Sequence, residues 1–423
     1  MTRTAVTSLS LALALSAGCS GAIAHTVTSD QDAAADAAID LGTQDTTVDA
    51  PEGAPEDAAL DPPTPPGRAV ALALGRQHAC ALDDAGHVYC WGASDVGQTG
   101  TGQHAALTVP QQVPLPPIAE IAAGEAHTCA REPSGRVWCW GFGADGQLGV
   151  RGTGLPACAA SQCAPEPMRV PAFEPAARIF AGGEETCVWL GDESLRCFGD
   201  AVPRAGVAAS VHGLLDLATG RHVTCWLTAD ELRCSGDDSG GARGDGDLDD
   251  GLVRLADVRA IDVGQGHACA VTSDGGVHCW GEGFGGTLGL IDAALPMRCD
   301  VQGCATSPIA IDGAAPASAI STALERTCVI GTDAHVRCWG EWDRTSTNIC
   351  DEASTLFCDL HPVEVAELLD PAQVSVGGEA MCAITRGGGV RCVGMSDDGV
   401  LGDGSRASGI VTTPSWVEGF PHL

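Results

Sequence analysis

The chain has 423 residues, of which 44% are hydrophobic and 4% aromatic, so it can bury a large core of mainly aliphatic side chains. Fifty-five acidic and 22 basic residues give a net charge of −33. Such a surface repels phosphate backbones and anionic lipids, which argues against direct binding of nucleic acid. Twenty-one cysteines indicate an oxidising compartment unless they bind metal.

The first eighteen residues have the pattern of an export signal. Arg3 supplies positive charge, an apolar run follows, and residues 16–19 read Ser-Ala-Gly-Cys. This box resembles the cleavage site of bacterial lipoproteins, which implies that 1–18 are removed and that Cys19 becomes the lipidated N-terminus. Ser20 after the cysteine favours the outer membrane by the same resemblance. The alternative is an ordinary secretory signal with an incidental cysteine.

Residues 19–66 differ in composition from the rest, with ten acidic residues, no arginine and a proline-rich end at 62–66. A segment without aromatic residues cannot bury enough apolar surface to offset the entropy cost of ordering. We therefore expect a disordered, extended tether that stands off the membrane. A calcium site is the alternative, but the spacing of the acids matches no calcium-binding loop.

The remainder, residues 67–423, contains seven copies of one template, in which two cysteines lie ten residues apart, or nine in the fourth copy. The pairs are Cys80–Cys90, Cys129–Cys139, Cys187–Cys197, Cys225–Cys234, Cys269–Cys279, Cys328–Cys338 and Cys382–Cys392. Each copy predicts a β-hairpin. If Cys80 and Cys90 lie opposite each other in the hairpin, a three-residue turn remains at 84–86. In the fourth copy, the same pairing leaves the two-residue turn Ala229-Asp230.

We predict that these cysteines form seven cross-strand disulfides. Directly opposed strand residues hold their β-carbons close to disulfide distance, especially at non-hydrogen-bonded positions. Zinc sites favour two to four residues between paired cysteines, and nine separate most of these. Three further pairs lie in the three longest intervals between hairpins and are expected to staple insertions: Cys158–Cys163, Cys299–Cys304 and Cys350–Cys358. Cys19 alone is left unpaired.

Strand-like runs flank the hairpins, such as 118–123 and 258–263 upstream and the proline-led 167–170, 308–311 and 362–365 downstream. Four short strands in each repeat of about 51 residues (357 residues over seven copies) predict an all-β, seven-bladed β-propeller. We expect the N-terminal and C-terminal strands to pair and close the ring, because closure removes exposed sheet edges.

The repeats also carry a second pattern of glycine, histidine and tryptophan. It is complete in Gly75-x-x-His78, Cys90-Trp91-Gly92 and Gly97-Gln98-x-Gly100, and recurs at Gly124-x-x-His127, Trp140-Gly141 and Gly146-Gln147-Leu148-Gly149. These motifs resemble repeats of the regulator of chromosome condensation family over nearly all of 67–423. Glu185, Val223, Arg326 and Ala380 replace the histidine, and Ser235 and Val393 replace the tryptophan.

The resemblance implies a propeller but not a single function. The family's eukaryotic founder exchanges nucleotide on a nuclear GTPase and contacts chromatin, and the export signal, disulfides and acidity argue against both activities here. Secreted bacterial members, including a propeller that inhibits β-lactamase by covering its active site, are the nearer functional analogy.

Most residues that stand out are expected to have structural roles. The recurring histidines His78, His127 and His267 are interpreted as hydrogen-bonded blade residues. Trp91, Trp140, Trp280 and Trp339 should pack between blades. The glycine-rich stretch 240–246 lacks the lysine of a phosphate-binding loop and is interpreted as a blade loop. Whether the acidic loop 237–250 holds calcium is left open.

The three stapled insertions, roughly 142–166, 283–307 and 341–361, are the candidate functional elements. All three join strands three and four of a blade, so they should project from one face, opposite the hairpin turns. Residues suited to contact are Phe142, Phe284, Trp342, Arg344 and Phe357.

The resulting functional hypothesis is a monomeric envelope lipoprotein that binds another macromolecule, most simply a protein, through this face. The lipid anchor would be its only contact with the membrane. The alternatives are an extracytoplasmic lyase or hydrolase at the channel mouth and a purely structural envelope component. The sequence shows no catalytic set and implies no cofactor.

Overall fold

The computed structural model describes residues 65–422, apart from gaps at 151–154, 156, 159–160, 200–208, 222, 239, 247, 249, 291–302, 315, 342–357 and 407–408. Within these residues the chain is all β, with two short 3-10 helices, η1 (Pro171–Phe173) and η2 (Phe284–Gly286). No helix in the described part is long and apolar enough to cross a membrane. The predicted signal, Cys19 and all but the last two residues of the predicted tether lie outside the described residues.

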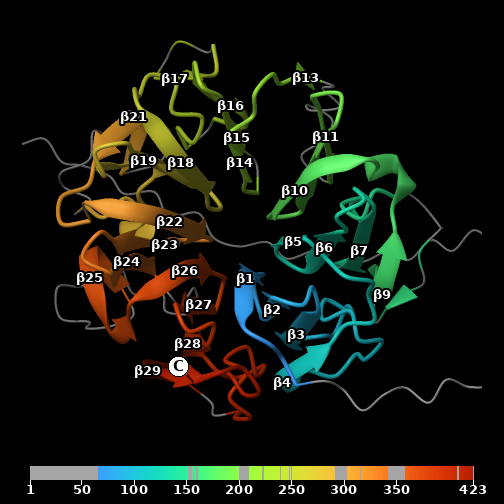
Figure 1. Cartoon of the computed structure of the whole chain (residues 1–423). Coiled ribbons are helices and arrows are strands. Elements are labelled where there is room, and N and C mark those ends of the chain that lie inside the picture. Colours follow the sequence, from blue (N-terminus) through green and yellow to red (C-terminus); the bar gives the residue numbers. More distant parts are fainter. Residues whose placement is uncertain are drawn as a thin grey trace, which may run out of the picture. The chain divides into compact units, whose positions relative to one another are not determined.

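Seven antiparallel sheets follow one another along the chain, and Figure 1 shows them arranged in order around a central axis. The first blade consists of β1 (Ala69–Leu74), β2 (His78–Asp83), β3 (Val88–Gly92) and β4 (Leu107–Gln112). The second consists of β5 (Glu120–Ala123), β6 (His127–Arg131), β7 (Val137–Phe142) and β9 (Ser161–Arg169), with β8 (Ala157–Cys158) as a fifth strand. The third consists of β10 (Ala176–Gly182), β11 (Glu185–Leu190), β12 (Ser194–Gly199) and β13 (Ala209–Ser210). Blades four and five are β14 (Asp216–Thr219), β15 (Val223–Leu227), β16 (Leu232–Gly236), β17 (Leu252–Val253); and β18 (Val258–Val263), β19 (His267–Thr272), β20 (Val277–Glu282), β21 (Cys304–Ala310). Blades six and seven are β22 (Ala317–Ala323), β23 (Arg326–Gly331), β24 (His335–Glu341), β25 (Cys358–Leu369); and β26 (Pro371–Val376), β27 (Ala380–Thr385), β28 (Val390–Met395), β29 (Ile410–Trp416). The predicted seven-bladed β-propeller is confirmed.

Each blade uses its four main strands in chain order, from the channel to the rim, and in the second blade β8 lies outside β9. The predicted upstream runs become the inner strands β5 and β18, and the proline-led runs become the outer strands β9, β21 and β25. Prolines suit outer strands because an edge position leaves the missing N–H without consequence for the ladder.

The central hairpins have the predicted register. Cys80 lies opposite Cys90 and Leu82 opposite Val88, and the Gly86 N–H donates to the carbonyl of Asp83 across the turn at 84–86. Gly86 has a φ of 88°, a conformation that glycine adopts without steric cost. In the fourth blade, the Thr228 N–H donates to the carbonyl of Glu231, which leaves the two-residue turn at 229–230.

All seven hairpins carry a disulfide between the paired strands. The Cα atoms of these cysteine pairs lie 4.0–4.1 Å apart, the short spacing of non-hydrogen-bonded pairs. Of the stapling pairs, Cys158 and Cys163 are bonded with their Cα atoms 5.7 Å apart. Cys304 is also disulfide-bonded. Its expected partner Cys299, and the Cys350 expected to pair with Cys358, lie outside the described residues.

The expected closure of the ring by pairing of the terminal strands is wrong. The C-terminal strand β29 pairs with β28 in the seventh sheet, and β1 pairs only with β2 among the described strands. Each repeat supplies its own outer strand, including β4 in the first blade, so none of the described strands is left to be exchanged. Blades seven and one are joined instead by other contacts: the Ala69 N–H donates to the carbonyl of Gly388, at 2.8 Å, and a shared apolar cluster includes Trp91 and Leu401.

Four buried tryptophans join neighbouring blades, as predicted. Each indole N–H donates to a backbone carbonyl in the strand-three-to-four connection of the preceding blade. The pairs are Trp91 to Val400 (2.7 Å), Trp140 to Gln98 (2.9 Å), Trp280 to Ala242 (2.9 Å) and Trp339 to Thr287 (3.0 Å). Because a buried indole needs a partner for its N–H, these bonds determine how one blade lies against the next.

Candidate functional site

The propeller has two faces with different connections. Strands alternate in direction, so the connections between strands one and two and between strands three and four lie on one side, here called the loop face. The hairpin turns and the links from one blade to the next lie on the other side, the turn face. The three stapled insertions follow β7, β20 and β24, and they therefore leave from the loop face as expected.

The second cysteine of each staple belongs to the outer strand. In the strand ladder, this cysteine lies opposite the last residue of the third strand of its blade. The opposed residues are Cys163 and Phe142 of β7, Cys304 and Glu282 of β20, and Cys358 and Glu341 of β24. The insertions are therefore shorter than predicted, 143–160, 283–303 and 342–357, because the outer strands begin at or before these cysteines.

Only part of the predicted contact set is placed on the loop face by the structure. Phe284 begins η2 and is 59% exposed, whereas Phe142 is partly buried at the end of β7. Trp342, Arg344 and Phe357 lie outside the described residues. Leu248, in the connection between β16 and β17, is 60% exposed, and the sequence analysis missed it. An isolated leucine between aspartates was its only signal.

The acidic loop of the fourth blade is organised by arginine. Asp238 and the buried Asp245 both approach Arg243, at 3.3 and 3.5 Å, and Asp250 pairs with Arg254 at 2.7 Å. The expectation that 240–246 is a blade loop fits this geometry, since its Ala242 carbonyl accepts the indole N–H of the next blade. Among the described residues, these carboxylates do not form a three-ligand metal cluster.

The three recurring histidines lie between blades. Each is almost fully buried, and its Nε2 hydrogen-bonds with the threonine hydroxyl that precedes the first cysteine of the next blade. The pairs are His78–Thr128 (2.8 Å), His127–Thr186 (2.8 Å) and His267–Thr327 (2.9 Å). Burial lowers the pKa of these histidines to about 4, 3 and 4 respectively. They are neutral packing residues rather than ligands of a site.

Blade three replaces the histidine with Glu185, which keeps the same connection. Its carboxylate accepts hydrogen bonds from Thr219 and Thr224 in blade four, at 2.5 and 2.7 Å. Burial is the main cause of its raised pKa, and the two threonine hydrogen bonds oppose the shift. Glu185 also lies near Cys187 and Cys197, but those sulfurs are bonded to each other and so are not free to bind metal.

The residue at the histidine position of one blade and the residue that it meets in the next blade vary together around the ring. Where the histidine position is apolar, at Val223 and Ala380, the residue before the next blade's first cysteine is alanine, at Ala268 and Ala79. This pattern was visible in the sequence, but recognising it requires knowing that consecutive blades meet at these positions.

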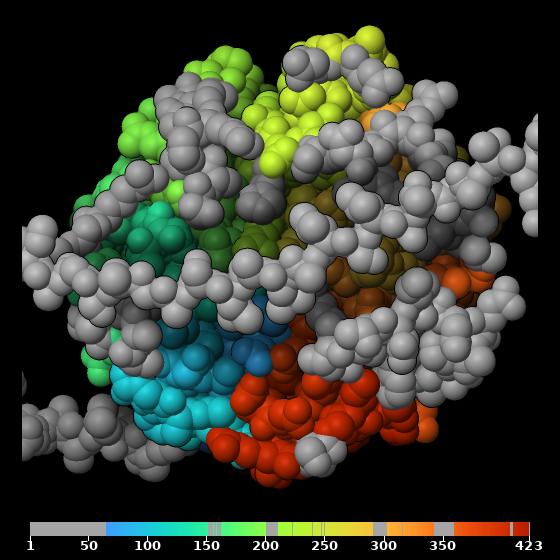
Figure 2. All heavy atoms as spheres, turned by 180° about the vertical axis from the view of Figure 1, so that it is seen from behind, coloured from blue at the N-terminus to red at the C-terminus, as the bar shows by residue number. Residues whose placement is uncertain are grey.

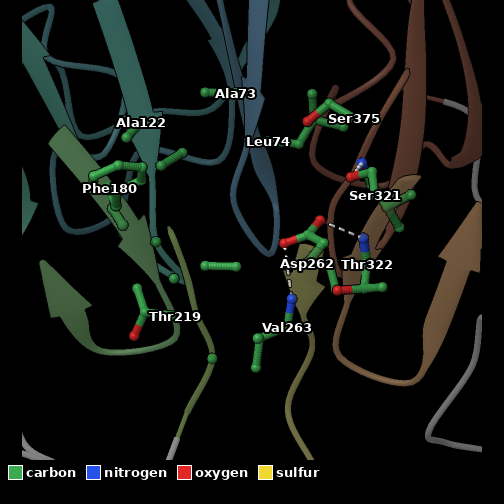
Figure 3. Close-up of a pocket in the computed structure, with 18 of the residues that line it drawn as sticks. Ala73, Leu74, Ala122, Phe180, Thr219, Asp262, Val263, Ser321, Thr322 and Ser375 are labelled. Atoms are coloured by element: carbon green, nitrogen blue, oxygen red, sulfur yellow. Dashed lines mark hydrogen bonds between the residues drawn. The ribbon is translucent and has the colours of Figure 1, made fainter. Parts of the chain in front are cut away.

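The inner strands line a central cavity of about 420 Å³ (Figure 3). Its wall consists of sheet edges, whose N–H groups need acceptors. Side chains of one blade accept hydrogen bonds from backbone N–H groups in the inner strand of the next blade. These bonds are Glu120 to Ile179 N–H (3.2 Å), Asp216 to Ile261 N–H (3.2 Å), Asp262 to Thr322 N–H (2.7 Å), Ser321 to Val376 N–H (3.1 Å) and Gln373 to Leu72 N–H (3.1 Å).

Most of the charged side chains in this wall are in ion pairs. Glu120 contacts Arg131 at 2.8 Å and Arg178 at 3.5 Å, and Arg76 contacts Glu125 at 3.1 Å. The channel carboxylates therefore connect blades, and no histidine is among the described residues that line the cavity.

Comparisons with known proteins agree with this geometry. Residues 85–131 and 134–189 match one sequence profile of the regulator of chromosome condensation (RCC1) repeat, and residues 69–98, 118–147 and 258–286 match a second. Among curated proteins, none matches the chain.

Several solved structures share the fold. Yeast RCC1 (Prp20) bound to Kap60 is 17% identical, with a TM-score of 0.65 over 83% of this chain and 85% of that one. Human WBSCR16 is 18% identical, with a TM-score of 0.62 over 78% and 94%. The ectodomain of the Physcomitrella patens receptor kinase CR4 is 18% identical, with a TM-score of 0.50 over 78% and 74%.

The ring of seven hairpins, with its histidine and tryptophan contacts between blades, defines a repeat-built seven-bladed β-propeller. Its residues 69–189 and 258–286 match repeats of the regulator of chromosome condensation family.

Proposed function

We propose that this protein is a lipid-anchored binding protein of the bacterial cell envelope, in the outer membrane, whose loop face docks another protein. The observation that carries the docking proposal is the placement of all three stapled insertions on that face. Long connections held by a rigid scaffold are where binding residues concentrate. Phe284 and Leu248, in neighbouring blades, add two large exposed apolar side chains there.

Two further observations support the location and the kind of partner. Seven hairpin disulfides in one propeller suit an oxidising compartment and not the cytosol. Among proteins of similar fold, yeast Prp20 has been crystallised bound to Kap60, and the CR4 propeller belongs to a receptor ectodomain. The fold is thus used for protein binding and outside the cytoplasm.

The lipid anchor is tested by the Cys19→Ala variant. Because the anchor would be the only membrane contact, we expect the variant to move from the membrane fraction to the soluble fraction of the cell envelope. The measurement is fractionation followed by immunoblotting, with mass spectrometry of the N-terminal peptide. Membrane association that persists in the variant would contradict the lipoprotein assignment.

The docking face is tested by cross-linking in envelope preparations. We expect the double variant Phe284→Ala, Leu248→Ala to reduce the yield of cross-linked partner by about tenfold or more, because apolar anchors carry most of the binding energy at interfaces. The matched control is Leu369→Ala, Leu215→Ala, which removes two side chains of similar exposure (61% and 54%) from the turn face, at the end of β25 and in the link between β13 and β14. Equal yields from the two double variants would refute the loop-face proposal.

A further inference from the structure

Asp216 and Asp262, on the wall of the central cavity, each accept two backbone N–H hydrogen bonds, but Arg178 acts on Asp216, whereas among the described residues no cation acts on Asp262. Figure 3 shows Asp262 on the channel wall, with dashed hydrogen bonds to the backbone of Val263 and Thr322. The two N–H groups donate to its oxygens at 2.9 and 2.7 Å. These bonds hold the carboxylate in place from two blades, so an incoming group would meet a preorganised acceptor.

Among the described residues, no cation balances the charge of this carboxylate. The charged group that acts on it is Asp216, which has the same sign and therefore raises the pKa of Asp262. Burial is the larger cause, and together they raise this pKa to about 7 against the opposing effect of the hydrogen bonds from Thr322, Val263 and Ser321. By contrast, Glu120, on the same wall, is paired with Arg131 and Arg178.

A second acceptor lies in the same blade. Gln265, which lines the cavity two residues after β18, has its amide oxygen buried without a hydrogen-bond partner among the described residues. A buried acceptor without a partner is costly unless a ligand or water supplies a donor. The cavity volume of about 420 Å³ is within the range of small-ligand sites.

We propose that the channel binds a cationic group, an ammonium or a guanidinium, at Asp262, with the amide oxygen of Gln265 as a second acceptor. A guanidinium carries five N–H donors and keeps its charge throughout the physiological pH range. The net charge of −33 would attract such a group to the protein. The source is either a small amine or guanidine, or a basic side chain of a partner. The proposal does not depend on the loop-face docking.

The test uses the capped peptide Gly-Gly-Arg-Gly-Gly and methylguanidinium as probes, titrated by calorimetry at pH 7.5 and low salt. We expect saturable binding that weakens at least tenfold in Asp262→Asn. The matched control is Asp274→Asn, which removes the same charge from the exposed hairpin turn of the same blade and should change affinity less than twofold. Binding of both probes indicates a small-molecule site, and binding of the peptide alone indicates a side chain of a partner.

A second measurement needs no variant. In the wild-type protein, the amide resonances of Val263 and Thr322 should shift with the same saturation curve, because both N–H groups bond to the Asp262 carboxylate. Failure of both probes to bind overturns the proposal. It is also overturned by equal weakening in Asp262→Asn and Asp274→Asn, or by binding that leaves these two resonances unchanged.

Discussion

Replacing Trp140 with alanine should lower the free energy of unfolding by about 3–5 kcal/mol. The side chain is fully buried between blades one and two, so the substitution leaves a large cavity at that interface. It also removes the donor to the Gln98 carbonyl, which is left buried without that hydrogen bond. Gly100, which has no side chain to move into the space, packs directly against the indole.

The measurement is urea-induced unfolding of the oxidised protein, followed by tryptophan fluorescence and circular dichroism. Trp138 provides the control, because it lies on the same strand but is only partly buried and bonds to Glu132 within its own blade. Trp138→Ala should therefore cost clearly less. Similar losses for the two variants would show that contacts between blades do not govern the stability of the ring.

Acid should destabilise the propeller between about pH 6.5 and pH 4 through its three buried histidines. Their folded-state pKa values of about 4, 3 and 4 lie below the ordinary value of 6.5, so the unfolded chain binds more protons in this window. The stability they contribute is complete above pH 6.5 and is lost as pH falls toward 4. At about 1.4 kcal/mol per pKa unit, these differences correspond to about 3–5 kcal/mol for each histidine.

The geometry explains why these rings resist protonation. Nε2 is occupied by the threonine of the next blade, and the Nδ1 atoms of His78 and His127 are buried without a hydrogen-bond partner among the described residues. A second ring proton would therefore enter a site with no acceptor. Asp262 acts in the opposite direction, because its raised pKa adds stability as pH falls below 7.

Variants separate these contributions. We expect His127→Gln to reduce the slope of unfolding free energy against pH by about one proton between pH 6.5 and 4. The control is His212→Gln, at a histidine whose side chain is 81% exposed, and this variant should change the free energy of unfolding less than His127→Gln does. The measurement is a series of denaturant titrations across this pH range, and identical slopes for wild type and His127→Gln would contradict the interpretation.

Contacts between blades were only partly predictable. The burial of Trp140 follows from its repeated place after a cysteine, but its partner Gln98 lies 42 residues earlier in the chain. Likewise, the pairing of His78 with Thr128 spans 50 residues. A single sequence shows that such positions recur, but it does not show which recurring position meets which.

The hairpins were determined by the sequence itself, because strand pairing across a turn of two or three residues depends on neighbours within about ten positions. The cysteine spacing therefore predicted their number, register and disulfides, and the repeat length predicted the propeller. Tertiary structure alone decided how the ring closes and what lies in the channel. Blade seven meets blade one through packing and backbone hydrogen bonds rather than through an exchanged strand. Asp262 faces the channel only because seven inner strands, far apart in the chain, converge there, and no local pattern encodes the burial of its carboxylate that results.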